Sequence, residues 1–368
     1  MVAARGDDVR YFFNGAPCER AVFEEEDNRD VTAAVVGATT AAVVTPSNGT
    51  SIANLASVLQ LAGDGCIRLF VAGAVTHIGK TTVCLSILAA LRAAGIKASE
   101  LAYVKPATQC EAPDLLKAWC QAEGVEYVSG EQAPLVFYQG FTRSFLKGDQ
   151  NTSRWWLDKI AARIDELSQG RRVVVVDGVG FPAVGSIVGV DNADVAKASR
   201  APVLLVCKSG VGEAVDTFSL NSTYFASKGV PVLGAVFNMG DVDGFNSWDK
   251  CGEFIDLWFS KMERRERNYG IIPVAPDLKG LRERISETAA EQISRLAALN
   301  ATHFAAHVDL AGIVRDAHLD PWNRHLPGVP PQKRPRLSPP QAVLKAPAKS
   351  REEVAAAAQK QGARRGGG

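Results

Sequence analysis

Short apolar runs alternate along the chain with longer segments in which apolar residues recur every three to four positions. The runs lie at residues 67–72, 100–104, 134–138, 173–176, 203–207, 232–237 and 271–274. Strands covered on both faces have such continuous apolar sequences, so the runs predict strands inside a sheet. Helical spacing is found at residues 83–91, 114–124, 155–167, 215–228 and 279–299. This order predicts an α/β fold, with a doubly wound, mostly parallel sheet and helices on both of its faces.

The two ends of the chain lack this alternation. Residues 1–65 form an N-terminal extension whose sequence indicates no clear structure. The α/β domain is expected at residues 66–315, with a last short helix near 301–315. From residue 316 to 368, Pro, Lys and Arg dominate, as in PGVPPQKRPRLSPP. Because this composition cannot bury a core, it predicts a disordered, basic C-terminal tail.

Charge and composition narrow the class of protein. With 41 basic and 40 acidic residues, the chain has no overall charge that favours nucleic acid, apart from the basic tail. No apolar run approaches the ~18 residues of a membrane span, and the first residues lack the apolar segment of a secretory signal. Seven dispersed cysteines without a C-x-x-C pair indicate reduced thiols. We therefore expect a cytoplasmic protein; Lys333, Arg334 and Arg336 form either a nuclear signal or a solubilising cluster.

A glycine-containing turn joins the first apolar run to its helix, with the sequence GAVTHIGKT from Gly73 to Thr81. A turn at a helix N-terminus offers unpaired N–H groups and the positive end of the helix dipole to a phosphate chain. Lys80 would add a charge near the β and γ phosphates, and Thr81 a hydroxyl for Mg²⁺. Gly79, together with Thr82 in the first helical turn, completes the predicted phosphate-binding loop (P-loop). The alternative is a glycine-rich turn that binds no ligand.

Polar residues follow three further strands, at Lys105, Asp177 and Asn238. Open α/β sheets bind ligands at the carboxyl ends of their strands, where these residues and the P-loop should meet. Asp177, after a run of four valines, is placed to orient Mg²⁺; otherwise it only starts a turn. Lys105 is either a second cation of the site or a surface lysine that ends a strand.

These motifs together resemble those of dethiobiotin synthetases. The P-loop of that family has the same spacing as Gly73 to Thr81, and the segments YVKPATQ, VVVVDGVG, AVFNMGD and IIPVAPDL match later family motifs in order. The similarity runs from about residue 67 to 278, a little over half the chain. It implies a P-loop NTPase fold, ATP and Mg²⁺ as cofactors, and a homodimer.

The resemblance also assigns residue roles. Lys80 and Lys105 would contact the phosphate and a carbamate intermediate, and Thr76 the organic substrate. Candidates for the adenine end are Asn238 and Pro273. The candidate metal ligands are Thr81, Asp177 and Asp114, of which Asp114 serves equally well as a helix N-cap.

Three departures from the family pattern lie toward the organic substrate. His77 replaces an acidic residue of the loop, and GFTRSFLKG has no counterpart of the family's Pro-x-Ser-Pro-His run. Gly212-Glu213 stands where the family has Asn-His. The expected function is therefore an ATP–Mg²⁺-dependent cyclo-ligase acting on a small amine or carboxylate that the sequence does not identify. The rival is a non-catalytic, ATP-binding regulatory module of the same superfamily.

Two other sequence patterns are weaker indications of function than the P-loop and the strand ends. A MinD- or ParA-like switch would have an additional lysine early in the P-loop, where this chain has Ala72, Gly73 and Ala74. His303 and His307, four residues apart, could share a helix face as metal ligands do. Without the Glu of an H-E-x-x-H motif and without a nearby third ligand, a solvated pair is the favoured interpretation.

Overall fold

The computed structural model describes residues 12–13, 16–17, 65–109, 115–275 and 290–324. Phe12–Phe13 (β1) and Ala16–Pro17 (β2) pair as two antiparallel strands, within a unit that comprises residues 1–45. The remainder of the predicted extension, and the tail beyond residue 324, lie outside the described residues. Within the described part of the chain, no helix is long and apolar enough to cross a membrane.

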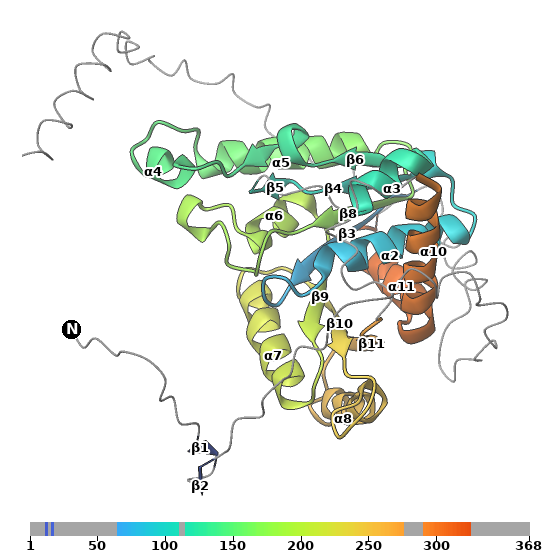
Figure 1. Cartoon of the computed structure of the whole chain (residues 1–368). Helices are drawn as coiled ribbons and strands as arrows, with labels where there is room; N and C mark the ends of the chain where they lie inside the picture. The colour runs from blue at the N-terminus through green and yellow to red at the C-terminus, as the bar shows by residue number, and fades with distance from the viewer. Residues whose placement is uncertain (1–11, 14–15, 18–64, 110–114, 276–289, 325–368) are drawn as a thin grey trace, which may run out of the picture. The chain divides into compact units, whose positions relative to one another are not determined.

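A sheet of seven parallel strands forms the centre of the fold (Figure 1). In spatial order the strands are β11 (Arg267–Pro273), β10 (Val232–Gly240), β9 (Val203–Lys208), β3 (Ile67–Gly73), β8 (Val173–Asp177), β4 (Leu101–Val104) and β6 (Glu126–Val128). β3, which leads into the P-loop, therefore lies between β9 and β8. The predicted doubly wound, mostly parallel sheet is confirmed.

Helices cover both faces of this sheet (Figure 1). One face carries α2 (Lys80–Ala93), α3 (Leu115–Glu123), α10 (Ala290–His307) and α11 (Leu310–Leu319). The other carries α5 (Ser153–Ser168), α6 (Asn192–Ser199), α7 (Gly212–Ser227) and α8 (Trp248–Lys261). Alternate residues of each strand face opposite layers: Val175 belongs to the first core and Val176 to the second. This explains why the strands are continuously apolar.

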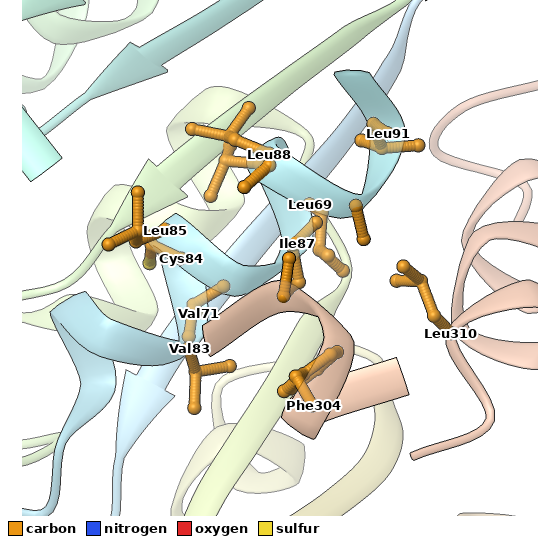
Figure 2. Packing of buried hydrophobic residues seen from close by; sticks show 14 of the residues in the cluster. Leu69, Val71, Val83, Cys84, Leu85, Ile87, Leu88, Leu91, Phe304 and Leu310 are labelled. Atoms are coloured by element: carbon orange, nitrogen blue, oxygen red, sulfur yellow. The ribbon is translucent and has the colours of Figure 1, made fainter. Parts of the chain in front are cut away.

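The first core is centred on α2. Figure 2 shows Val83 and Ile87 of α2 with Val71 and Leu69 of β3, in one cluster that also contains Phe304 of α10 and Leu310 of α11. Phe304 is 1% exposed. The helix that begins at the P-loop is thus held between the sheet and the C-terminal helices.

Some elements differ from the predictions. The run at 134–138 contributes only Leu135–Val136 (β7), which pairs with Ala107–Thr108 (β5) in a separate two-stranded sheet. The C-terminal helices also lie elsewhere than predicted: α10 continues through residue 300 to His307, and Asp309 caps α11 by accepting from the N–H of Gly312. Periodicity alone did not predict α6, α8 or the short helix Phe141–Leu146 (α4).

The folded region extends beyond the predicted tail boundary at residue 316, which falls inside α11. Past that helix, the buried side chain of Asn323 accepts a hydrogen bond from the N–H of Arg68 (3.0 Å) and donates to its carbonyl (2.9 Å). β3 pairs with β9 only from Phe70 onward. Asn323 therefore pairs with a part of the central strand that β9 does not reach, and it fixes the C-terminal segment against the sheet.

Candidate nucleotide-binding site

The P-loop connects the end of β3 at Gly73 to the start of α2 at Lys80. A Cβ atom on Gly73 would lie 2.9 Å from Ile78 Cγ2 and 3.0 Å from the Val75 carbonyl oxygen. Gly79, the residue before the helix, has φ +83°, and a Cβ there would lie 2.3 Å from Asn238 Nδ2. Both positions therefore require glycine, for close backbone approach and for a left-handed conformation.

Asn238, at the carboxyl end of β10, contacts this loop directly. Its Nδ2 donates a hydrogen bond of 2.8 Å to the carbonyl oxygen of Ile78. The residue predicted for the adenine end thus also holds the loop that precedes α2. Sequence spacing could not indicate this contact, because the two residues are 160 positions apart.

Asp177, the last residue of β8, lies at the centre of the site and is fully buried. Its Oδ1 accepts a hydrogen bond of 2.7 Å from Lys80 Nζ. Its Oδ2 accepts from Tyr103 OH at 2.7 Å and from Thr81 Oγ1 at 3.2 Å. The prediction that Asp177 and the P-loop residues lie together at one edge of the sheet agrees with this geometry.

The surroundings of Asp177 favour its ionised form. Burial by itself raises the pKa of a carboxyl group, since it penalises the charge. The ammonium groups of Lys80 and Lys105, with the hydrogen bonds from Lys80 and Tyr103, outweigh that effect and hold the pKa of Asp177 below its ordinary value of 3.8. Asp177 is therefore a carboxylate at neutral pH.

Lys105 follows β4 and is 3% exposed. Its backbone N–H donates to the Val128 carbonyl of β6 at 2.8 Å, and its ammonium charge acts on Asp177. The alternative of an exposed lysine at a strand end is therefore wrong. Two lysines, one at the start of α2 and one directly after β4, therefore act electrostatically on one buried carboxylate.

Pro273, the second residue predicted for the adenine end, is the last residue of β11, and its carbonyl oxygen lies 2.9 Å from His303 Nε2 of α10. His307 Nδ1 lies 2.8 Å from the His303 carbonyl, and the Trp248 ring meets the His307 ring nearly perpendicularly at 4.8 Å. The interpretation of the two histidines as a solvated pair is wrong: both are partly buried and hydrogen-bonded to the backbone. Among the residues with described side chains, no cluster of metal-ligating groups includes them.

Sequence comparison with known proteins shows which family the chain belongs to. A family model described as an AAA domain matches residues 67–280, which is more than half of the chain. The ATP-dependent dethiobiotin synthetase BioD of Frankia casuarinae is 33% identical over 175 residues, covering 46% of this chain and 69% of that protein. The chain belongs to the dethiobiotin synthetase-like family of P-loop NTPases.

A second curated relative and a solved structure are also similar to this chain. The ATP-dependent dethiobiotin synthetase BioD of Anaeromyxobacter dehalogenans is 30% identical over 175 residues, covering 46% of this chain and 75% of that protein. Among solved structures, the Cyanothece McdA(D38A)–ATP complex aligns with a TM-score of 0.37 and 14% identity, over 66% of this chain and 97% of that one.

The residues of this dethiobiotin synthetase-like site fit a magnesium nucleotide. Thr81 Oγ1 and the Asp177 carboxylate are hard oxygen donors within 3.2 Å of each other, and Mg²⁺ prefers one or two such ligands with water and phosphate. Asp114, the other candidate ligand, lies outside the described residues. Thr76 and Thr82 are exposed, and the hydrogen bonds to Asp177 described above come from Lys80, Thr81 and Tyr103 instead.

Two residues that the sequence did not indicate, Tyr103 and Asn192, also shape this site. Tyr103 donates to Asp177 and stacks on Tyr127 with ring centroids 5.1 Å apart. It lies two positions before Lys105, so strand alternation could have placed it on the same face. Asn192 holds the turn after Asp177 by accepting from the Val179 N–H at 2.9 Å and donating to the carbonyls of Val179 and Phe181. No local pattern indicates that contact.

Proposed function

We propose that the protein is an ATP- and Mg²⁺-dependent ligase of the dethiobiotin synthetase type. The observation that carries this proposal is the group of Lys80, Lys105 and Thr81 around the buried carboxylate of Asp177, at the carboxyl edge of the sheet. A structural ion pair would need one lysine, whereas transfer of a phosphoryl group benefits from several fixed cations. The family comparison supports the reaction type, and the organic substrate remains a small amine or carboxylate.

In this chemistry an amine nitrogen bonds to the carbon of CO₂ and loses a proton, which gives a carbamate. A carbamate oxygen attacks the γ phosphorus of ATP and ADP leaves. A second amine then attacks the carbonyl carbon, phosphate leaves, and a cyclic urea forms. Each step moves negative charge among the carbamate, the transferred phosphoryl group and the leaving oxygen. Lys80 and Lys105 would hold and neutralise that charge from two sides.

The metal site would use Thr81 and Asp177. When bound, Mg²⁺ would supply positive charge to the phosphate oxygens. Lys80 Nζ and Thr81 Oγ1 both hydrogen-bond to Asp177. A bound phosphate chain would therefore share the Lys80 ammonium group with this carboxylate. Tyr103 would keep its hydrogen bond and continue to orient Asp177.

The second candidate function is an ATP-binding regulatory module without turnover. The substrate-side departures favour it: Glu213, in place of a family Asn-His, forms an ion pair with Lys208 at 3.1 Å. His77 is exposed in the P-loop and has φ +61°. These residues differ from the family where the organic substrate would bind. The buried Lys105 favours the enzyme instead, because a nucleotide-binding module has no need of a second cation at the transferred phosphate.

The experiment that separates the two uses ¹⁴C-bicarbonate, ATP and Mg²⁺ with a diamine, first diaminopelargonate. A carbamate loses CO₂ in acid, whereas a cyclic urea does not, so acid-stable radioactivity reports ring closure. The ligase predicts acid-stable product together with ADP formation. ATP binding without ADP formation, for diaminopelargonate and for a panel of diamines and amino acids, would instead support the regulatory module.

A further inference from the structure

Helix α10 contacts both ends of the nucleotide-binding site. Asn300 and His303, one turn apart on this helix, reach the first turn of α2 and the carbonyl of Pro273 respectively. The helix (Ala290–His307) lies beyond residue 280, where the family match ends. The two contacts therefore come from a part of the chain that the family match does not include.

At the phosphate end, the buried side chain of Asn300 donates to Ser86 Oγ at 2.7 Å. Ser86 Oγ donates in turn to the carbonyl of Thr82 at 2.8 Å, and Asn300 Nδ2 lies 3.5 Å from the same carbonyl. Thr82 lies in the first turn of α2, directly after the P-loop. Phe304 of α10 also packs in the core cluster that includes α2 (Figure 2), so α10 fixes the position of that first turn.

At the base end, the hydrogen-bond partners define the His303 tautomer. A carbonyl oxygen only accepts, so His303 must carry a proton on Nε2 to donate to Pro273. By the same argument, His307 carries its proton on Nδ1 and donates to the His303 carbonyl. Trp248 lies against the His307 ring. The two imidazoles are therefore fixed in orientation, and His303 holds the carbonyl of Pro273 in place.

Pro273, which His303 contacts, ends the edge strand of the sheet. Within the seven-stranded sheet β11 pairs with β10, and an antiparallel bridge joins its Gly270 to Val308. At its carboxyl end, the N–H of Val274 donates to the Gly240 carbonyl at 2.9 Å, and the next described residue after position 275 is 290. The contact from His303 thus ties this end of the strand to α10, next to the hydrogen bond from Val274.

We propose that His303 is a positioning residue for the nucleobase end of the site and Asn300 for its phosphate end. This inference rests on the proposed function, in which the chain binds ATP along this edge of the sheet. A rigid helix that contacts both ends sets their separation, and a ligand that spans the two ends depends on that separation. Loss of the His303 contact should weaken ligands with a base and leave ligands with phosphates alone unchanged.

The test compares Mg–ATP with Mg–tripolyphosphate, which has the phosphates without the nucleoside, by titration calorimetry. For His303→Leu we expect the ATP dissociation constant to rise about 5- to 10-fold, the equivalent of one lost hydrogen bond. Tripolyphosphate affinity should stay within about 2-fold. Asn300→Leu should weaken both ligands, because it loosens the P-loop helix. Thr302→Ala, at an exposed neighbouring position whose hydroxyl bonds only within α10, is the matched control.

Conservative variants separate positioning from mere packing. Gln places its amide nitrogen close to the position of Nε2, whereas Asn places it near Nδ1. His303→Gln should therefore retain ATP affinity and His303→Asn should lose it. If His303→Leu fails to fold, the comparison of these two variants still tests whether His303 positions Pro273. Equal loss of both ligands in the His303 variants, or unchanged ATP affinity in all of them, would overturn the inference. Failure of the wild-type protein to bind ATP would overturn the proposed function itself.

Discussion

Asp177→Asn is the perturbation whose effect on stability follows most directly from the structure. The carboxylate is fully buried, Lys105 is 3% exposed and the Lys80 side chain is 10% exposed. Removing one partner of a buried pair leaves an uncompensated charge and typically costs about 3–5 kcal/mol. The asparagine can still accept one hydrogen bond from Tyr103 or Thr81, so we expect a loss near the lower end, about 3 kcal/mol.

Urea denaturation followed by circular dichroism measures this loss. Asp158→Asn is the control, since it removes a carboxylate from an exposed helical ion pair with Arg154 (2.9 Å) and should cost at most about 0.5 kcal/mol. A loss from Asp177→Asn no larger than that of the control would refute the reasoning. It would show that both lysines reach solvent and that Asp177 is not their counterion.

Although Asp177→Asn should destabilise the protein without ligand, we expect the variant to gain more stability than the wild type from bound ATP. In the wild type, the Lys80 ammonium group hydrogen-bonds to Asp177, so a phosphate competes with this carboxylate for it. In Asp177→Asn, the two lysines lack a counter-charge that the phosphates can supply. ATP without Mg²⁺ should therefore stabilise the variant more than the wild type. Equal stabilisation of both proteins would contradict a direct competition for Lys80.

Three further predictions concern single elements of the account. Lys80→Ala should remove most Mg–ATP affinity in calorimetry while the far-ultraviolet circular dichroism stays unchanged; unchanged binding would rule out the P-loop assignment. A chain ending at Pro321 should have an unfolding free energy about 2–4 kcal/mol lower than a chain ending at Arg324. Only the longer chain keeps the three side-chain hydrogen bonds of Asn323. Equal unfolding free energies of the two chains would contradict this prediction. Burial lowers the pKa of His307 below 6.5. Its contribution to stability is therefore present above pH 6.5 and declines as pH falls through the folded-state pKa. His307→Gln should flatten this part of the stability–pH curve, and an unchanged slope would contradict the role of His307.

The sequence predicts the fold well where one physical rule decides the structure. Strands buried on both faces must be apolar throughout, so 173–176 and 203–207 are recognisable without any partner. The P-loop is equally local, because Gly73 and Gly79 are required by contacts within or beside the turn. The four strand ends meet because parallel strands share one carboxyl edge.

Other parts of the structure depend on contacts between distant residues, which no local pattern encodes. Asn323 pairs with Arg68 across 255 positions, so composition placed the tail boundary too early. His303 has its partner 30 positions away, and its spacing to His307 resembles a metal motif although the structure uses both side chains to hold backbone carbonyls. Asn323 and His303 each hydrogen-bond to backbone groups that lie outside the sheet ladder at those positions.

The most direct test of the central claim is the effect of Lys105→Met on ATP turnover and on ATP affinity, measured side by side. If Lys105 stabilises the charge that shifts between carbamate and phosphoryl group, turnover should fall by about 10²-fold or more while the ATP dissociation constant changes by less than about 3-fold. Lys261→Met, at an exposed position on α8, should change neither quantity. Wild-type turnover that Lys105→Met leaves intact, or a loss of ATP affinity as large as the loss of turnover, would contradict the role assigned to this lysine.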